Sequence, residues 1–425
     1  MSKVVCTPPG LVPEHLSEGV EYFAMFKSSG RQDVSTVGTG VLQDVEKAGI
    51  CPDVRTWDFA TFALAVSAAD LAVPRAPSAD GWTRVIELSV ALVDPKPFAL
   101  LVPSLQEMLR FLTGDFWRLC FEAGGTPAPA STAPKSFQAD CVSLLSGGVD
   151  SLVGAIDLTH QGRQPLFVSQ MAKGDSETQV RYAKKLGATD RHLQWNHNIR
   201  VVHPTERSTR GRSIVFFAFA ALGASALAAK HQPVKVFVPE NGFISLNISL
   251  NAGRTGSLST KTTHPVFLDH LQKIWTALGL QAELVRLYAF KTKGELMAEC
   301  FDQITLAELI GDSTSCGRFG YYNYTHCGRC VPCLVRRASF LGSGLVDTTK
   351  KKYHFSKLKT AGRKNGANDI GAVAAAVLRN EMLGVRRLTL GQLSFATPVE
   401  RAQYEGVVAR GLSELGDLLR QEKVL

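Results

Sequence analysis

The chain has 425 residues, of which 45% are hydrophobic, and a formal net charge of +9 at pH 7. This length and hydrophobic content suffice for sizeable cores in two or three units, and no apolar run approaches the ~20 residues of a membrane-spanning helix. The N-terminus has no basic segment followed by an apolar one, so we expect a cytoplasmic protein with no membrane partner. The positive charge suits nucleotides, but Lys and Arg are dispersed, so direct nucleic-acid binding is not indicated.

Residues 1–123 show alternating apolar patterns, as at 82–92, followed by helical spacing over 102–112. These patterns predict an accessory α+β domain that carries no chemical motif. We expect its charged residues to be ordinary surface or hinge charges, among them Asp70, Arg75, Asp80 and Arg84. Residues 124–138 are rich in Pro and small residues, which indicates a linker.

Residues 139–340 alternate short apolar runs with helical patterns, as in a parallel sheet that helices cover on both faces. The expected strands are 142–145, 165–169, 192–195, 234–238 and 283–287. The expected helices are 151–160, 176–186, 213–230 and 265–278. The third helix is apolar on nearly every side and should be buried. The pattern predicts an α/β nucleotide-binding domain with its ligand beyond the carboxyl ends of the strands.

Residues 146–151 read Ser-Gly-Gly-Val-Asp-Ser and join the first strand to the first helix of this domain. Such a turn exposes backbone N–H groups at the positive end of the helix, which favours a phosphate. Gly147 and Gly148 let the backbone approach the anion, and Asp150 can cap the helix or help hold Mg²⁺. We therefore predict a pyrophosphate site for ATP that consists of Ser146, Gly147, Gly148, Val149, Asp150 and Ser151. Its catalytic side chains would be Ser146, Asp150 and Ser151.

Other polar residues follow the remaining strands at the same edge of the predicted sheet. Gln170 and Arg212 are assigned to the nucleotide, and Arg210 is assigned to catalysis, because guanidinium groups bind phosphate and carboxylate well. For the two arginines, a solvent-exposed basic turn is the alternative. Lys291, beyond the fifth strand, is a further catalytic candidate, and Lys293 beside it could also meet phosphate. A plain helix start would explain both lysines equally well.

Four of the nine cysteines lie close together, at Cys316, Cys327, Cys330 and Cys333. The last three are two residues apart, a spacing that folds the chain back so that several sulfurs can reach one centre. A four-cysteine zinc site is closed, so this zinc would be structural, and an iron–sulfur cluster is the main competitor. Residues 341–425 form a C-terminal extension with helical patterns at 369–379 and 404–419.

Together these motifs resemble the 7-cyano-7-deazaguanine synthase (QueC) family of pyrophosphatase-loop (PP-loop) enzymes. The resemblance covers roughly residues 140–340 and rests on 146–151, Lys291-Thr-Lys-Gly-Glu295, the four cysteines and Arg336-Arg337, in the family's order. It implies an adenine nucleotide alpha hydrolase-like fold, ATP and Mg²⁺ as cofactors, and a structural zinc. It also implies an AMP-forming ligase that adenylates 7-carboxy-7-deazaguanine. Three residues at the end of the fourth strand could then read the guanine-like edge, or simply form a turn: Glu240, Asn241 and Gly242.

The chain also departs from that family. The Tyr-Gly-Gln-Arg-His pattern is replaced by Ser169-Gln-Met-Ala-Lys-Gly174, the Pro-x-Arg-Asn segment is replaced by residues 206–213, and both terminal regions are additional. This layout resembles the QueC-like components of the Qat anti-phage systems, known as QatC. That resemblance implies transfer of the deazaguanine acyl group to the N-terminal amine of a partner protein from a defence operon.

Three other functions stay open. A nitrile synthase that uses ammonia would need no accessory domain, whereas a non-catalytic nucleotide-binding scaffold would not need an intact loop. A tRNA-thiolating relative would want a catalytic cysteine pair separate from the metal set.

Overall fold

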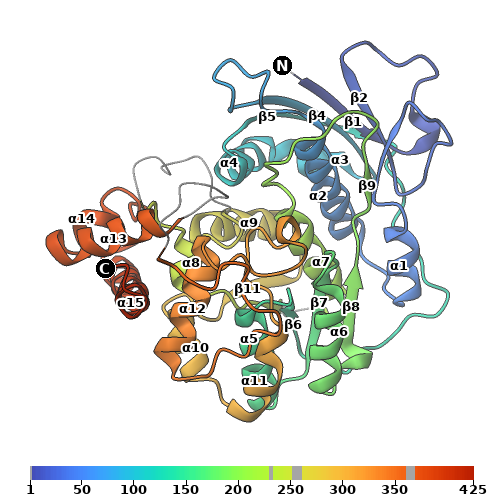
Figure 1. Cartoon of the computed structure of the whole chain (residues 1–425). Coiled ribbons are helices and arrows are strands. Elements are labelled where there is room, and N and C mark those ends of the chain that lie inside the picture. The colour runs from blue at the N-terminus through green and yellow to red at the C-terminus, as the bar shows by residue number, and fades with distance from the viewer. Residues whose placement is uncertain (1, 229–232, 251–260, 360–368) are drawn as a thin grey trace.

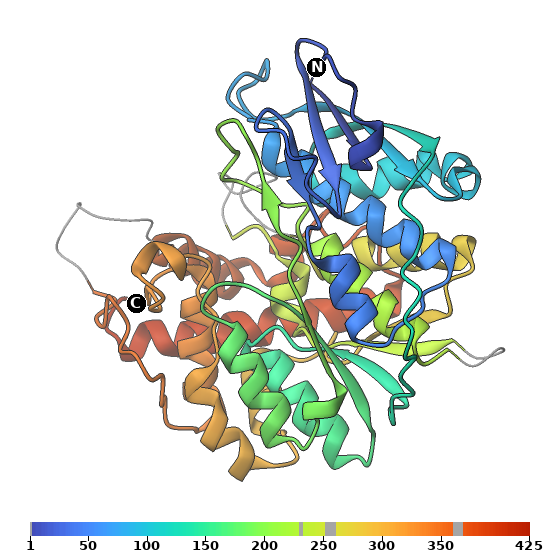
Figure 2. The ribbon, with the colours of Figure 1, turned by 90° about the vertical axis from the view of Figure 1, so that its right-hand side faces the viewer.

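The computed structural model describes residues 2–228, 233–250, 261–359 and 369–425, and these form two sheets surrounded by helices. Figures 1 and 2 show the N-terminal sheet at the top of the molecule, the second sheet below it and the C-terminal helices beside it. Within the described ranges, no helix combines the length and the apolar character that a membrane span requires.

The second sheet has five parallel strands in the order β11-β10-β6-β7-β8. Their bounds are Cys141–Leu144 (β6), Pro165–Gln170 (β7), His192–Trp195 (β8), Val234–Val238 (β10) and Ala282–Arg286 (β11). All five predicted strands are confirmed, because short apolar runs between helical patterns are typical of strands that are buried on both faces.

Helices cover both faces of this sheet. The helices of this region are α5 (Val149–His160), α6 (Ser176–Lys185), α7 (Ser213–Ser225), α8 (Gly242–Leu246) and α9 (Pro265–Leu278). Leu166 and Val168 of β7 pack in the same core as α7, whereas Phe167 between them packs with α5. Helix α7 is almost entirely buried, as predicted. It ends at Ser225, earlier than expected, and residues 229 and 230 of the expected helix lie outside the described residues.

The N-terminal sheet has six strands in the order β5-β4-β1-β2-β3-β9. They are β1 (Ser2–Thr7), β2 (Val20–Met25), β3 (Ser35–Val37), β4 (Val85–Leu92), β5 (Phe116–Ala123) and β9 (Ile199–Arg200). Its helices are α1 (Val41–Lys47), α2 (Val54–Ala72), α3 (Pro95–Leu100) and α4 (Val102–Thr113). Only β9 runs antiparallel, so this unit is α/β rather than the expected α+β. Apolar alternation indicates which face of a strand is buried but not the direction of its neighbour.

One hydrophobic core joins the two sheets. Helix α2 begins at Asp53, whose carboxylate accepts hydrogen bonds from the backbone N–H groups of Arg55 and Thr56, both at 3.0 Å. It packs on β4 on one side and on α7 on the other, so its whole central stretch, 56–70, is buried. Residues 124–138, the expected linker, contain no helix or strand.

The C-terminal part of the chain packs in two further cores. Its helices are α10 (Lys293–Ala298), α11 (Gln303–Leu309), α12 (Val331–Ser343), α13 (Ile370–Leu383), α14 (Val385–Thr389) and α15 (Pro398–Gln421). Helices α10 and α11 pack with α5 in one of these cores, and α8, α12, α13 and α15 pack in the other. The longest, α15, starts with a capping box between Thr397 and Glu400 and buries its apolar side against α8, α12 and α13. Both predicted C-terminal helices are present and are longer than expected.

Candidate active site

The turn between β6 and α5 has the geometry of an anion-binding loop. Gly147 has φ +90°, which a residue with a side chain adopts only under strain, and Gly148 stands at the N-cap of α5. The Ser146 hydroxyl accepts a hydrogen bond from the Gly148 N–H at 3.3 Å and lies 3.1 Å from the Ser151 hydroxyl. Because the N-cap has no side chain, no side-chain cap covers this helix terminus, and it keeps its positive partial charge.

This loop opens into a cavity of about 370 Å³, a size typical of small-molecule sites. The polar lining of the cavity includes Ser146, Asp150, Ser151, Glu240 and Lys293, and the apolar lining includes Phe216, Phe217, Val238, Pro239 and Ile244. The cavity lies beyond the carboxyl ends of β6 and β10, where a parallel sheet is expected to bind its ligand.

Asp150 is buried and fully engaged by its neighbours. One carboxylate oxygen forms an ion pair with the Lys293 ammonium. The other accepts hydrogen bonds from the backbone N–H of Asn241 at 3.1 Å and from its side-chain amide at 2.6 Å. Burial alone would raise the pKa of Asp150, but the Lys293 charge lowers it below its usual value. Asp150 is therefore an ionised anchor for Lys293 and for the turn after β10.

Glu240 is the second acidic residue of the cavity. Burial and the charge of Asp150 raise the pKa of Glu240 well above its usual value, and its carboxyl is within hydrogen-bonding reach of Asp150. The raised pKa favours the protonated form of Glu240, which can donate a proton to a hydrogen bond. Asn241 is fully buried and caps α8, while a side chain at Gly242 would lie 2.1 Å from the Ala289 carbonyl oxygen. Neither Asn241 nor Gly242 lines the cavity.

Gln170 and Arg212 lie on the other side of the loop. The Gln170 side-chain amide is 3.2 Å from Nδ1 of His197. The Gln179 side-chain amide donates to the backbone carbonyls of Gln170, at 3.3 Å, and of Ser146, at 3.0 Å. Arg212 is exposed just before α7, within electrostatic range of Asp175 and His197. A side chain at Gly147 would lie 3.5 Å from Cβ of Asp175, so Asp175 borders the loop.

Lys291 and Arg210 point away from the cavity. The Lys291 ammonium forms an ion pair with Glu299 at 2.5 Å. The Arg210 guanidinium lies 5.0 Å from the ring centre of Trp82 and donates to the Thr113 carbonyl at 3.3 Å. The structure therefore brings Lys293, rather than Lys291, to the loop, and it places Arg210 against the N-terminal unit.

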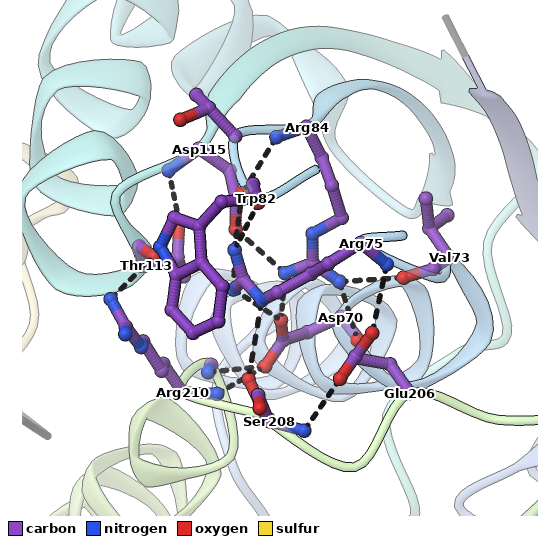
Figure 3. A network of polar contacts seen from close by, with 12 residues as sticks. Asp70, Val73, Arg75, Trp82, Arg84, Thr113, Asp115, Glu206, Ser208 and Arg210 are labelled. Atoms are coloured by element: carbon purple, nitrogen blue, oxygen red, sulfur yellow. Dashed lines mark hydrogen bonds and ion pairs between the residues drawn. The ribbon is translucent and has the colours of Figure 1, made fainter. Parts of the chain in front are cut away.

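Around Arg210 lies a buried network that corrects the expectation of ordinary surface or hinge charges (Figure 3). Arg75 binds both carboxylate oxygens of Asp115, at 2.8 and 3.0 Å, and Arg84 bridges Asp115 and Asp70. These four side chains are at most 3% exposed. Of the residues expected to be surface or hinge charges, which were Asp70, Arg75, Asp80 and Arg84, only Asp80 is exposed.

The same network holds the segment that precedes α7. One oxygen of Asp70 accepts the backbone N–H groups of Arg210 and Gly211, both at 2.6 Å, and Glu206 accepts the Arg75 N–H at 2.8 Å (Figure 3). These partners are separated by more than 100 residues, so no local pattern predicts that the network is buried. The N-terminal unit thereby fixes the start of α7, which supplies Phe216 and Phe217 to the cavity.

The four cysteines converge as predicted. The sulfurs of Cys316, Cys327, Cys330 and Cys333 are buried and lie within 4.8 Å of one another. The Cys316–Cys330 and Cys327–Cys333 sulfur distances are 3.9 and 3.8 Å. A tetrahedral zinc with ~2.3 Å bonds to sulfur would separate its ligands by about 3.8 Å. The set thus fits a single metal ion such as zinc.

Backbone N–H groups also point at these sulfurs. Arg318 and Cys327 donate to the Cys316 sulfur at 3.4 and 3.3 Å, and Arg329 and Cys330 donate to the Cys327 sulfur at 3.4 and 3.3 Å. Such donors stabilise thiolates, the form in which cysteine binds metal.

The segment that carries the four cysteines also forms a wall of the cavity. The Thr314 N–H donates to the Gly147 carbonyl at 3.0 Å, and Thr314, Ser315 and Cys316 line the cavity. The buried Arg336 guanidinium donates to the Ser313 hydroxyl at 2.6 Å and so fixes this wall. A metal held by the cysteines would therefore stabilise the neighbouring loop of residues 146–151, the glycine loop.

Several residues of the site have no recognisable signal in the sequence. The helix α7 is apolar on nearly every side, which indicates that it is buried but not which of its residues line a cavity. The sequence therefore does not single out Phe216 and Phe217. Gln179 and Thr314 hold the loop from positions without any motif, and no signal in the sequence distinguishes them.

Comparison of the chain with protein-family models, with curated proteins and with solved structures gives no match.

Proposed function

We propose that the chain is an ATP-dependent ligase that adenylates the carboxylate of 7-carboxy-7-deazaguanine, or a related deazapurine, and transfers the acyl group to an amine. The resemblance of its motifs to the QueC family supplies the substrate class. One observation carries the proposal: the α5 N-terminus, with two glycines and two serines and without a side-chain cap, opens into a cavity that also holds the Lys293 ammonium.

The reaction has two steps. A carboxylate oxygen attacks the α-phosphorus of ATP, the bond to pyrophosphate breaks, and an acyl-adenylate forms. The amine nitrogen then attacks the acyl carbon, AMP leaves and the nitrogen loses a proton. The N–H groups at the start of α5, the Ser146 and Ser151 hydroxyls and Lys293 would bind the phosphates and offset the charge that develops on pyrophosphate.

Magnesium would supply further charge compensation on the phosphates. Asp150 and Glu240 are the acidic residues among the described lining of the cavity, and Asp150 is already bound by Lys293 and Asn241. Mg²⁺ would therefore be held chiefly by the nucleotide phosphates and water, a common arrangement for this ion. Zinc at the four cysteines would be structural, because four thiolates leave no open position.

The substrate ring would lie in this cavity, whose lining is both apolar and acidic. Phe216 and Phe217 offer aromatic surface to a flat heterocycle, and Glu240, whose raised pKa favours its protonated form, could both donate to the ring and accept from it. This role deepens the predicted one for Glu240, whereas the buried Asn241 and Gly242 would act only by shaping the turn.

The test supplies ATP, Mg²⁺ and 7-carboxy-7-deazaguanine to the purified protein. We expect AMP and pyrophosphate rather than ADP, and a hydroxamate when hydroxylamine traps the acyl-adenylate. A free nitrile with ammonium would favour the synthase, whereas ATP binding without AMP would favour the scaffold. For transfer to a defence partner, we expect a mass gain on a co-expressed partner protein that disappears in Asp150→Ala.

A further inference from the structure

The C-terminal helix α15 contacts the turn that presents Lys293 to the cavity. The Glu414 carboxylate accepts a hydrogen bond from the Thr292 hydroxyl, and Thr292 is 1% exposed. A side-chain carbon at Gly294 would lie 2.6 Å from the same Glu414 oxygen. Glu414 thus touches both neighbours of Lys293.

The contact acts on the residue that begins α10. Thr292 is the N-cap, and its hydroxyl accepts the Glu295 N–H at 3.1 Å while the Glu295 carboxylate accepts the Thr292 N–H at 2.8 Å. Lys293 is the first residue of the helix, and its ammonium pairs with Asp150. The direction of the Lys293 side chain therefore depends on a cap that Glu414 holds from outside.

A second contact from α15 fixes the two ends of this turn. The Arg410 guanidinium pairs with Glu295 and donates to the Phe290 carbonyl at 2.8 Å. On the same helix, a side chain at Gly411 would lie 2.4 Å from the Phe243 ring of α8, the helix that follows Glu240. Helix α15 therefore supports two cavity walls that are far apart in sequence.

We propose that Glu414 is a positioning residue that holds the N-terminus of α10 so that Lys293 faces the phosphates of the nucleotide. The inference rests on the proposed function, in which Lys293 binds those phosphates. It assigns a role in the active site to the C-terminal extension, which carries no chemical motif of its own.

The experiment compares Glu414→Leu with Glu414→Gln, which keeps an acceptor for the Thr292 hydroxyl. Asp417→Leu, on the exposed side of the same helix, is the matched control. We expect Glu414→Leu to raise KM for ATP about tenfold or more, as for the loss of a hydrogen bond to a charged group, with Tm close to that of the control. Glu414→Gln should stay within about threefold of the wild type.

Amide hydrogen exchange at residues 293–295 provides a readout that does not depend on activity. Among the Glu414 variants and the control, we expect faster exchange at these residues only in Glu414→Leu. This expectation does not depend on AMP formation. If the wild type forms no AMP, that result contradicts the proposed function but not the contact made by Glu414. If Glu414→Leu does not fold, Gly294→Ala tests the same contact by displacing the carboxylate. Unchanged KM and exchange in these variants, or equal losses in Glu414→Leu and Glu414→Gln, would overturn the proposal.

Discussion

Asp150 and Lys293 form a buried ion pair at the cavity, although 143 residues separate them in the chain. The pair joins the glycine loop to the turn after β11, and Asn241 completes the hydrogen bonds of the carboxylate. A buried pair of this kind contributes less to stability than its geometry suggests, because both charges lose their hydration. Its position beside an uncapped helix terminus favours a role in binding phosphate.

Removal of one charge of this pair should cost more than removal of both. Lys293→Met and Asp150→Asn should each destabilise the protein, Lys293→Met by about 3–5 kcal/mol, because each leaves its partner without its charge complement. The double variant should lose less than either single variant, and denaturant unfolding of all four proteins gives the coupling energy. Additive losses would contradict the pairing.

The glycine loop can be tested with a matched pair of glycines that flank α5. Gly147→Ala and Gly162→Ala both place a side chain at positive φ, +90° and +79°, at opposite ends of the helix. Each should cost about 1–2 kcal/mol in stability, but only Gly147→Ala should weaken ATP binding, by about tenfold or more. Calorimetric titration with ATP measures this difference. Equal ATP affinity in the two variants would remove the loop from the site.

The cysteine cluster predicts one bound metal ion per chain. Metal analysis of the purified protein should find one zinc, and Cys330→Ser should lose it together with several kcal/mol of stability. Cys51→Ser, which alters an exposed thiol outside the cluster, is the control. Visible absorbance and several irons per chain would indicate an iron–sulfur cluster instead.

The network in the N-terminal unit predicts a pH dependence of stability. Burial alone would raise the pKa of Asp115, but Arg84 lowers it below its usual value. The carboxylate thus stabilises the folded state above the unfolded pKa of about 3.9, and this contribution disappears as the pH falls through the folded pKa. Asp115→Asn should therefore lose about 3–5 kcal/mol near pH 7 and progressively less below about pH 4.

Denaturant unfolding as a function of pH measures this difference. Asp140→Asn, in an exposed ion pair with Arg163, should cost less than about 1 kcal/mol at every pH. A pH-independent loss in Asp115→Asn would show that the carboxylate is not the ionised partner of Arg84.

The sequence predicted those parts of the protein that depend on local patterns. The five strands of the second sheet were predicted from apolar runs. The turn at Gly147 and Gly148 was predicted from its glycines, and the four-cysteine cluster was predicted from the spacing of its cysteines. Contacts between distant segments could not be predicted in this way. Nothing around residues 199–200 indicates that they extend the N-terminal sheet, and nothing near Asp70 indicates that it binds the N–H groups of residues 210 and 211.

The choice between the two lysines illustrates the same limit. Lys291 and Lys293 are equivalent candidates in the sequence, both beyond the fifth strand. A helix that begins at residue 293 turns one side chain toward Asp150, while the other pairs with Glu299. The packing of α10 against α5, α12 and α15 separates them.

The exchange of labelled pyrophosphate into ATP is the sharpest test of the proposed adenylation, because it requires reversible adenylation at the loop and no acceptor amine. We expect labelled ATP when the protein, Mg²⁺ and 7-carboxy-7-deazaguanine are all present, and a loss of this exchange in Lys293→Met. The absence of exchange in the wild type, or exchange that is indifferent to the deazaguanine, would contradict the proposed function.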